Sequence, residues 1–380
     1  MIRHEYGIWP FSRMDKNLQY LAKSFIHQRK PATESDRTHY SNVHRELQRW
    51  TSSNVEENEK VLRLSAMGDL MWIRSGWRDF LSPGIANHLA SRDLRIANLE
   101  TPIHPGKPVK KYVYETLQYN APPEYLVPWD HPSAHTILSI CNNHILDQGP
   151  DGLALTRKEI LSHKNFLCVG GFSEEDAICF VEVKGHRIAY IGLTYDVNRM
   201  RRESIPPGIP VHLFGRLGFE PDWDKIQELI SLARRGGAEL TILLPHWNYE
   251  YEYWPDELHR QHAYRLIELG IDIILGSAPH VLQPVEIVSV DQWDPSLKTQ
   301  LKRGGPPRFG IIGYSLGNFA SIMPTLACNV GVILDLDLSF GERGELSLHK
   351  IQVYPTYSSR GQNGWLDVQT RELGAQMENA

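Results

Sequence analysis

Seven short apolar runs, separated by segments with helical spacing, constrain the fold of this chain most strongly. They span residues 61–67, 94–99, 135–141, 187–193, 239–245, 271–276 and 309–316. Each run is continuous rather than alternating, which is typical of a strand that is buried on both faces. Strands that alternate with helices form a largely parallel sheet with helices packed on it. The sequence therefore predicts an α/β fold.

Two of the intervening segments carry clear helix signals. Residues 222–237 have an apolar face at helical spacing and end in two glycines, and residues 255–270 begin with proline and end with glycine. Further along the chain, residues 331–340 and 345–355 alternate between apolar and polar side chains. This alternation predicts two antiparallel strands after the mainly parallel part of the fold.

The two ends of the chain depart from this pattern. Residues 1–58 are polar and show little apolar periodicity. We expect them to form an extension with short helices that packs on the main domain, because they hold too few apolar residues for a core of their own. Residues 59–357 then form the main domain, and the polar residues 358–380 form a loosely held C-terminal tail.

Composition and charge exclude several classes of protein. The chain has 380 residues and a formal net charge of −5, so it lacks the basic excess of a general nucleic-acid binder. No apolar run approaches the roughly 20 residues that span a membrane, and the N-terminus lacks the apolar centre of a signal peptide. The four cysteines form no C-x-x-C pair, which favours a reducing compartment, so we expect a cytoplasmic protein. The sequence carries no signal for an oligomeric state.

Polar side chains that bind metals follow five of the apolar runs. They are Asp69, Glu100, the Asn142-Asn143-His144 segment, His246 and His280. In open α/β sheets the ligand crevice lies outside the carboxyl ends of the strands, so these groups can meet in one place. Each also has an ordinary structural explanation, such as a helix N-cap for Asp69 or simple packing for His246 beside Trp247. The recurrence at five strand ends favours a shared site, and carboxylate, amide and imidazole donors suit Mn, Zn or Fe.

These residues lie in motifs that resemble one known family. The motifs are Gly68-Asp69, Asn98-Leu99-Glu100, Cys141 to Gly149, His246-Trp247 with Glu250, Gly276 to Glu286, and Tyr314 to Phe319. In this order, over residues 61 to 357, they resemble the CapA family of poly-γ-glutamate capsule-synthesis proteins, whose domain looks like a calcineurin-like metallophosphatase. The resemblance implies a four-layer α/β/β/α sandwich of the metallophosphoesterase type.

The resemblance also implies a role for each residue by its place in a motif. The implied metal ligands are Asp69, Glu100, Asn143, His246 and His280. The implied catalytic residues are His144, Asp147 and Glu250. The implied substrate contacts are Asn98, Asn142 and Asn318, together with Arg199 from a loop that also holds Arg201 and Arg202 and that has the alternative interpretation of a solvated loop.

The sequence departs from the phosphatase pattern in three places. Asp69 is followed by Leu70 and Met71, where phosphatases commonly have Asp-x-His. Ala278 replaces the first histidine of a His-Pro-His motif, and Asn248 stands where the family often has glycine. Because a lost ligand weakens metal binding by orders of magnitude, we expect one tightly bound divalent metal or a weak second site.

Three functions from different classes remain open. The first is metal-dependent hydrolysis of a phosphate ester or acyl phosphate. The second is formation or cleavage of an amide bond in a carboxylate-rich, glutamate-like substrate, since one fold hosts unrelated reactions. The third is a non-catalytic binding protein with a degraded metal site. In the first two cases the expected partner is a small-molecule or peptide-like anionic substrate.

Overall fold

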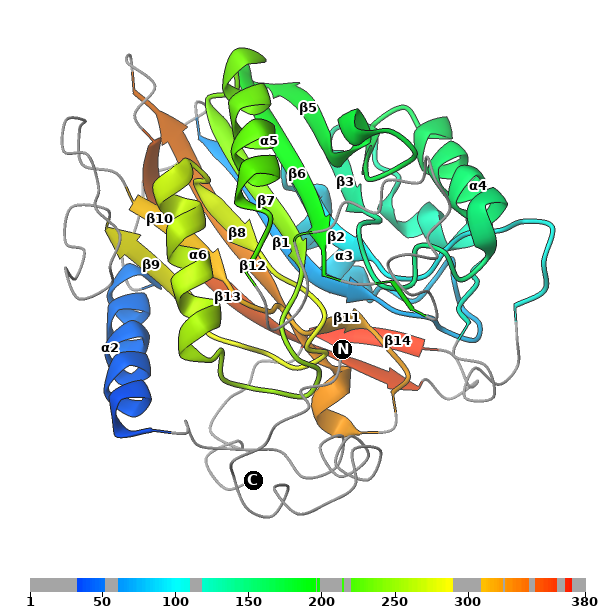
Figure 1. Cartoon of the computed structure of the whole chain (residues 1–380). Helices are drawn as coiled ribbons and strands as arrows, with labels where there is room; N and C mark the ends of the chain where they lie inside the picture. The colour runs from blue at the N-terminus through cyan, green and yellow to red at the C-terminus, as the bar shows by residue number, and fades with distance from the viewer. Residues whose placement is uncertain are drawn as a thin grey trace.

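Two β-sheets stacked face to face form the centre of the protein, and helices cover their outer faces (Figure 1). The computed structural model describes residues 33–51, 61–109, 118–195, 197–198, 214, 220–289, 309–323, 325–341, 346–360 and 366–370. All structural statements below concern these residues.

The first sheet has eight strands and contains the start of the α/β pattern. Its order is β14-β13-β12-β1-β2-β3-β4, with β11 paired to β1. Strands β1 to β4 run parallel to one another and β11 runs parallel to β1, while the β1–β12, β12–β13 and β13–β14 pairs are antiparallel. The bounds are β1 Leu62–Leu70, β2 Leu94–Leu99, β3 His135–Ser139, β4 Phe166–Val169, β11 Asn318–Ala320, β12 Val330–Phe340, β13 Leu346–Arg360 and β14 Leu366–Thr370.

The second sheet has six strands in the order β5-β6-β7-β8-β10-β9. Its four central strands are parallel, and β5 and β9 close the two edges in antiparallel fashion. The bounds are β5 Ile178–Val183, β6 His186–Thr194, β7 Leu240–His246, β8 Ile273–Leu275, β9 Val285–Ser289 and β10 Phe309–Gly313. The runs predicted as buried strands correspond to β1, β2, β3, β6, β7, β8 and β10, so that prediction is confirmed.

Three apolar clusters separate the layers. One lies between the sheets, a second packs α3 (Pro83–Ala90) and α4 (Gly149–Ser162) on the first sheet, and a third packs α5 (Trp223–Arg235) and α6 (Glu257–Leu269) on the second. The four-layer α/β/β/α arrangement is therefore confirmed. Short 3-10 helices complete the described elements: η2 Pro123–Trp129, η3 Glu174–Ala177 and η6 Leu326–Asn329.

The two predicted helices correspond to α5 and α6, and the signals at their ends have clear structural roles. The side chains of Asp222 and Asp256 accept hydrogen bonds from backbone N–H groups in the first turns of these helices, as N-caps do. Gly270, which ends α6, has a φ of 121°, a conformation that side-chain-bearing residues rarely adopt.

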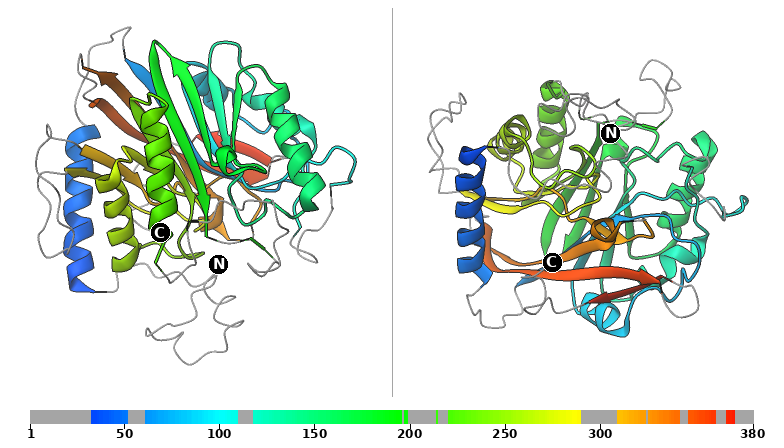
Figure 2. Two further views of the ribbon diagram at one scale, coloured as in Figure 1. Left: turned by 45° about the horizontal axis from the view of Figure 1, so that its top comes forward. Right: turned by 90° about the horizontal axis from the view of Figure 1, so that it is seen from below.

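Within the N-terminal extension the structure describes one helix, α2 (Glu34–Thr51). It lies along β9 and β13, where the edges of the two sheets come together (Figure 2). Residues 1–32 and 52–58 lie outside the described residues. At the other end, the expected boundary at residue 357 falls within β13, which continues to Arg360 and pairs with β14.

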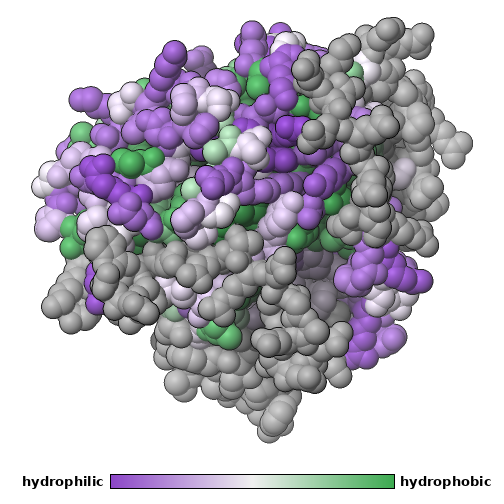
Figure 3. Space-filling model, turned by 180° about the vertical axis from the view of Figure 1, so that it is seen from behind, coloured by the Kyte–Doolittle hydropathy of each residue, from purple (hydrophilic) through white to green (hydrophobic). Residues whose placement is uncertain are grey.

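The surface and the cysteines show ordinary features. On the face turned away in Figure 1, the described residues are mostly hydrophilic, with small groups of apolar ones between them (Figure 3). All four cysteines are free. None of the helices in the described part of the chain has the length and apolar character needed to cross a membrane.

Candidate metal centre

The end of β1 places Asp69 between β2 and β11. The register pairs Asp69 with Asn98 on one side and with Asn318 on the other, after an irregularity that begins at Ala66. A Cβ atom on Gly68 would lie 1.8 Å from the carbonyl oxygen of Gly317, so only glycine allows this close approach. As a result the Asp69 backbone N–H donates to Gly317 at 2.9 Å, and the Asp69 carboxylate is fully buried.

Glu100 follows β2 and is the most conspicuous buried acid of the protein. Its Oε1 atom has no hydrogen-bond partner. The Nε2 atoms of three imidazoles face it, at 3.7 Å for His246, 3.9 Å for His280 and 4.0 Å for His144. These distances are too long for hydrogen bonds, but they suit a metal ion between the atoms, because two ligands of one ion lie up to about 4.2 Å apart.

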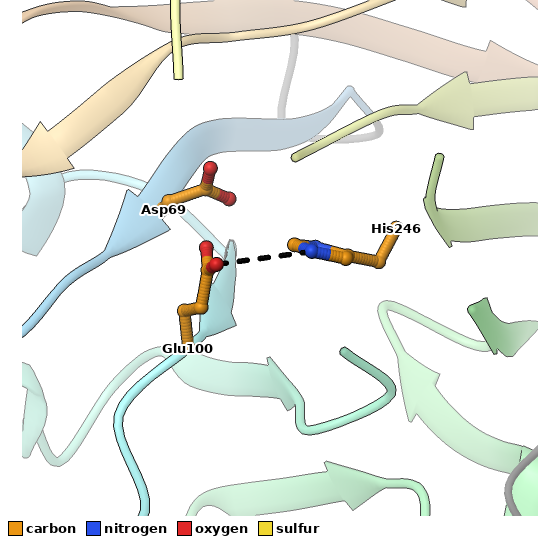
Figure 4. A group of neighbouring side chains, drawn as sticks. All are labelled: Asp69, Glu100 and His246. Atoms are coloured by element: carbon orange, nitrogen blue, oxygen red, sulfur yellow. Dashed lines mark ion pairs between the residues drawn. The ribbon is translucent and has the colours of Figure 1, made fainter. Parts of the chain in front are cut away.

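The tightest group of donors comes from three strand ends that belong to different sheets. Asp69, Glu100 and His246 each offer one ligand atom, and these atoms all lie within 4.8 Å of one another. Figure 4 shows His246 pointing from the second sheet towards Glu100, with Asp69 beside it. The donor set fits a divalent metal, because buried carboxylates require a nearby positive charge.

The pKa values of the centre show how its charge is balanced. Burial and the charge of Asp69 raise the pKa of Glu100 well above its usual value. Burial and the neighbouring His280 and His144 lower the pKa of His246 well below its usual value, so His246 is neutral and available as a metal ligand. Burial alone would lower the pKa of His280, but the acids, chiefly Glu100 and Asp69, raise it to about 9. Without a metal, protonated His280 supplies the positive charge.

Contacts at Nδ1 orient the His246 ring. Its Nδ1 atom lies 3.0 Å from the hydroxyl of Ser277, and that hydroxyl donates to the carbonyl of Pro245 at 3.4 Å. The amide nitrogen of Asn98 lies 3.3 Å from the same Nδ1 atom, so both residues fix the plane of the ring. In the tautomer in which the Ser277 oxygen accepts from Nδ1–H, the Nε2 lone pair faces Glu100. Metal-binding histidines are commonly held in this way by a partner on the second nitrogen.

His144, in the loop after β3, forms a separate unit with Asp147. Its Nδ1 atom lies 2.6 Å from Asp147 Oδ2, which also accepts from the backbone N–H of Tyr119 at 2.7 Å. The ring of Tyr119 stacks on the imidazole with centroids 3.9 Å apart. The Nε2 atom of His144 points into the centre, where Asn198 Nδ2 lies 3.2 Å away. The arrangement holds one imidazole nitrogen and leaves the other for proton transfer.

Asn143 presents a second oxygen without a partner. Its Oδ1 atom is buried and makes no hydrogen bond, while its Nδ2 atom donates to Asn198 at 3.3 Å. A buried amide oxygen without a donor is costly, and a metal ion would satisfy it. The unpaired oxygens of Glu100 and Asn143 are thus two separate signs that the centre fits a cation.

The three asparagines expected to contact substrate make their hydrogen bonds within the protein. Asn98 donates to Asp69 at 2.8 Å, and Asn142 donates to Asn98 at 3.1 Å. Asn318 Oδ1 lies 3.1 Å from His280 Nδ1, and its amide donates to the carbonyl of Cys328. These contacts position the side chains of the centre.

Of the remaining expected residues, Glu250 is buried and its charge contributes to the high pKa values of Glu100 and His280.

Three expected side chains, Arg199, Arg201 and Arg202, lie outside the described residues. Sequence reasoning missed three residues that contact side chains of the centre: Ser277, Tyr119 and Asn198. Ser277 lies inside a motif that was identified, two residues from the proline before His280, so its position was a usable signal. Tyr119 and Asn198 lie in loops that carry no such pattern.

Backbone strain concentrates around the centre. The described residues include five non-glycine residues with positive φ, and four of them lie in the loops after β7 and β8: Asn248, Tyr251, Ala278 and His280. The φ of 74° at Asn248 is a physical reason for a glycine preference at that position. Its Oδ1 atom accepts from the Tyr249 N–H at 2.8 Å, so it is already engaged. Strained residues of this kind cluster at functional sites.

Two curated proteins are similar to this chain over part of their length. The capsule biosynthesis protein CapA of Bacillus anthracis is 27% identical over 280 residues, which cover 69% of this chain and 60% of that protein. The PGA biosynthesis protein CapA of Bacillus subtilis (strain 168) is 30% identical over 190 residues, which cover 48% of this chain and 42% of that protein. The chain thus matches less than two thirds of the length of either relative.

Solved structures overlap more loosely. A hypothetical protein from Thermus thermophilus has a TM-score of 0.41 at 13% identity, over 80% of this chain and 100% of that one. A phosphatase from Mycoplasma pneumoniae has a TM-score of 0.38 at 12% identity, over 78% of this chain and 93% of that one. Overlaps at this level establish nothing further about the chain.

The family itself follows from the match to a family model. The model of the bacterial capsule synthesis protein family PGA_cap matches residues 63–323, which is more than half of the chain and contains every residue of the candidate metal centre. The chain belongs to this capsule synthesis family, the CapA family.

Proposed function

We propose that this protein is a metal-dependent hydrolase that cleaves a phosphate ester or an acyl phosphate of an anionic substrate. The observation that carries the proposal is the buried Oε1 atom of Glu100. It has no hydrogen-bond partner, lies within 4.0 Å of three imidazole nitrogens and stands beside the buried Asp69. A buried carboxylate oxygen without a hydrogen-bond partner, held among three imidazoles, is the arrangement that a bound cation would stabilise.

The proposed ligands are Asp69, Glu100, Asn143 and His246, with His280 beside them. When bound, a divalent metal polarises a phosphoryl oxygen and lowers the pKa of a water molecule. The chain's own contribution is to hold the donors: Ser277 fixes the His246 ring, and Asn98 fixes the Asp69 carboxylate at 2.8 Å. With Ala278 in place of a histidine, we propose one tight site and at most a weak second one.

His144 is the proposed proton donor to the leaving group. Asp147 holds its Nδ1 atom at 2.6 Å, and Tyr119 fixes the plane of its ring. These contacts leave Nε2 facing the centre, 4.0 Å from Glu100 Oε1. A positioned imidazole of this kind typically contributes about 10²–10⁴-fold to a rate, mostly for leaving groups that need protonation.

Amide chemistry on a carboxylate-rich, glutamate-like chain is the second candidate. The matched relatives are named for capsule and PGA biosynthesis, and this is the observation that favours it. In either reaction the proposed substrate is anionic, and Arg199 and its neighbours are proposed to bind its oxygens.

Metal analysis followed by assays with added Mn²⁺ tests the proposal. We expect close to one metal per chain, hydrolysis of an aryl phosphodiester or acetyl phosphate, and loss of both metal and activity in Glu100→Gln. The His144→Gln variant should keep its metal and lose more rate with alkyl than with aryl leaving groups. Metal binding with amide turnover only would favour the second candidate. Absence of bound metal at millimolar Mn²⁺ would contradict the proposal and favour a non-catalytic binding protein.

A further inference from the structure

We propose that α2 is a positioning element for the loop of residues 247–256, which it holds from outside through the carbonyl oxygen of Pro255. This loop joins the end of β7 to α6 and carries Asn248, Glu250 and Tyr251. The inference rests on the proposed function only for its effect on metal binding. The family match begins at residue 63, so α2 is an addition outside the matched region.

The buried side of α2 is a narrow and mostly polar stripe. Tyr40 and Val43 are buried, Asp36, His39 and Leu47 are partly buried, and the other described side chains of the helix are exposed. With so little apolar area, packing alone would hold the helix weakly. The polar residues of the stripe therefore carry much of the contact and determine where the helix docks.

The contact converges on the carbonyl oxygen of Pro255. The Tyr40 hydroxyl donates to it at 2.7 Å, and Arg260 Nη1 lies 3.3 Å from it. The same Arg260 nitrogen donates to Asp36 at 2.7 Å. Arg260 lies in the first turn of α6, where the helix dipole disfavours a cation, and Asp36 offsets that repulsion. The ring of Tyr40 also packs on Trp254, with centroids 4.9 Å apart.

The loop that receives this contact needs support from both sides. Asn248 and Tyr251 have φ values of 74° and 64°, which surrounding contacts must maintain. On the inner side, the Tyr251 N–H donates to the carbonyl of Pro279 at 2.8 Å, and Asn248 donates to Gln283. The contact with α2 at Pro255 fixes the outer end of the same loop.

A second polar chain links α2 to the residue next to His246. His39 lies 3.3 Å from the Tyr264 hydroxyl, which donates to Glu286 at 2.8 Å. The Tyr314 hydroxyl donates to the other oxygen of Glu286 at 3.2 Å, and Trp247 Nε1 donates to the carbonyl of Tyr314 at 2.9 Å. Both ends of the loop, at Trp247 and at Pro255, are therefore connected to α2.

Hydrogen–deuterium exchange of the full-length protein tests this role without an activity assay. The double variant Asp36→Asn, Tyr40→Phe keeps the shape of the stripe, removes the negative charge that pairs with Arg260 and removes the hydroxyl that donates to Pro255. We expect the amides of residues 247–256, including that of Tyr251, to exchange about 2- to 10-fold faster, as for the loss of one or two buried hydrogen bonds. The control Glu34→Gln removes only the exposed pair with Arg37 on the same helix and should change nothing.

Calorimetric titration of the same proteins with Mn²⁺ gives the second readout, with binding weakened about 2- to 10-fold in the double variant. Faster exchange within α2 together with an unchanged loop and unchanged Mn²⁺ affinity would overturn the inference. If α2 stays protected, Val43→Asp releases it, and the same two measurements decide. A wild-type protein that binds no Mn²⁺ would contradict the proposed function, while the exchange comparison would still decide the role of α2.

Discussion

The two sheets contribute unlike halves to the candidate metal centre. The first sheet supplies carboxylates, Asp69 and Glu100, at the ends of two neighbouring parallel strands. The second sheet supplies imidazoles, and its loops after β7 and β8 hold non-glycine residues at positive φ, such as Ala278 and His280. The difference indicates that the first half provides the charge that attracts a cation, while the second half adjusts how tightly it is held.

Removal of the Glu100 charge should reduce Mn²⁺ affinity more than any other change proposed here. We expect Glu100→Gln to lose at least about 100-fold in Mn²⁺ affinity, because even indirect partners of a metal contribute 10–100-fold. Since burial and Asp69 disfavour the charged form of Glu100, the metal-free variant should melt at a higher temperature than the metal-free wild type. Calorimetry and thermal melts measure both. Asp335→Asn, a buried acid outside the centre, is the matched control, and equal Mn²⁺ affinities in the two variants would refute the assignment.

The high pKa of His280 predicts that metal binding releases a proton from the centre. Its folded-state pKa of about 9 lies above the usual 6.5, so His280 is protonated at pH 7 and deprotonates as pH rises through 9. A bound cation displaces that proton, so Mn²⁺ affinity should rise up to about tenfold per pH unit between pH 7 and 9. Titrations at pH 7 in two buffers of different ionisation enthalpy should report proton release, to which His280 and Glu100, both with raised pKa values, contribute. His280→Gln should reduce that release, and an unchanged release would show that His280 does not contribute to it.

Ser277 tests how the second sheet holds its imidazole ligand His246. Because its hydroxyl orients the His246 ring, Ser277→Ala should weaken Mn²⁺ binding about tenfold while the fold stays intact. Ser65→Ala, which removes a buried hydroxyl bonded to Asp335, controls for the loss of a serine elsewhere. Titration and circular dichroism separate affinity from stability. If both variants bind Mn²⁺ like the wild type, Ser277 does not orient the ligand.

Ala278 gives the smallest expected change, and it is the one prediction of a gain in metal binding. We expect the unmodified protein to hold fewer than two tightly bound metals, and Ala278→His to raise metal occupancy by adding an imidazole donor. Ala278 has a φ of 98°, so the control Ala278→Gly should relieve strain of about 1 kcal/mol without adding a donor. Metal analysis by mass spectrometry and thermal melts distinguish the two variants. Two fully occupied metals in the unmodified protein would contradict the expectation.

The sequence predicted the ligands at the strand ends better than the contacts of the strained loops after β7 and β8. Continuous apolar runs located the strands, and the rule that ligands gather at carboxyl ends brought Asp69, Glu100 and His246 together in advance. The role of Ser277 in orienting His246 and the strain at Ala278 depend on contacts between loops, which leave no periodic signal. Such contacts join residues that are far apart in the chain or that lack any repeated spacing.

The ends of the chain were harder to predict for a related reason. Helix α2 buries only Tyr40, Val43 and, in part, Leu47 as apolar residues, so its periodicity is weak beside its polar contacts. The strand β13 passes the expected boundary because pairing with β12 and β14, rather than an apolar pattern, continues it to Arg360. In both cases tertiary contacts outweigh the local pattern that a sequence displays.

The central position of β1 has a consequence for how the chain is made. On one side β1 pairs with β2, which follows closely, but its other neighbours, β11 and β12, begin only at Asn318 and Val330. At a ribosomal rate of about 5–20 residues per second, that edge of β1 stays open for roughly 13–52 s after it emerges. An open apolar edge invites pairing with other nascent chains. The open edge of β1 therefore remains available for such pairing until β11 and β12 have been made.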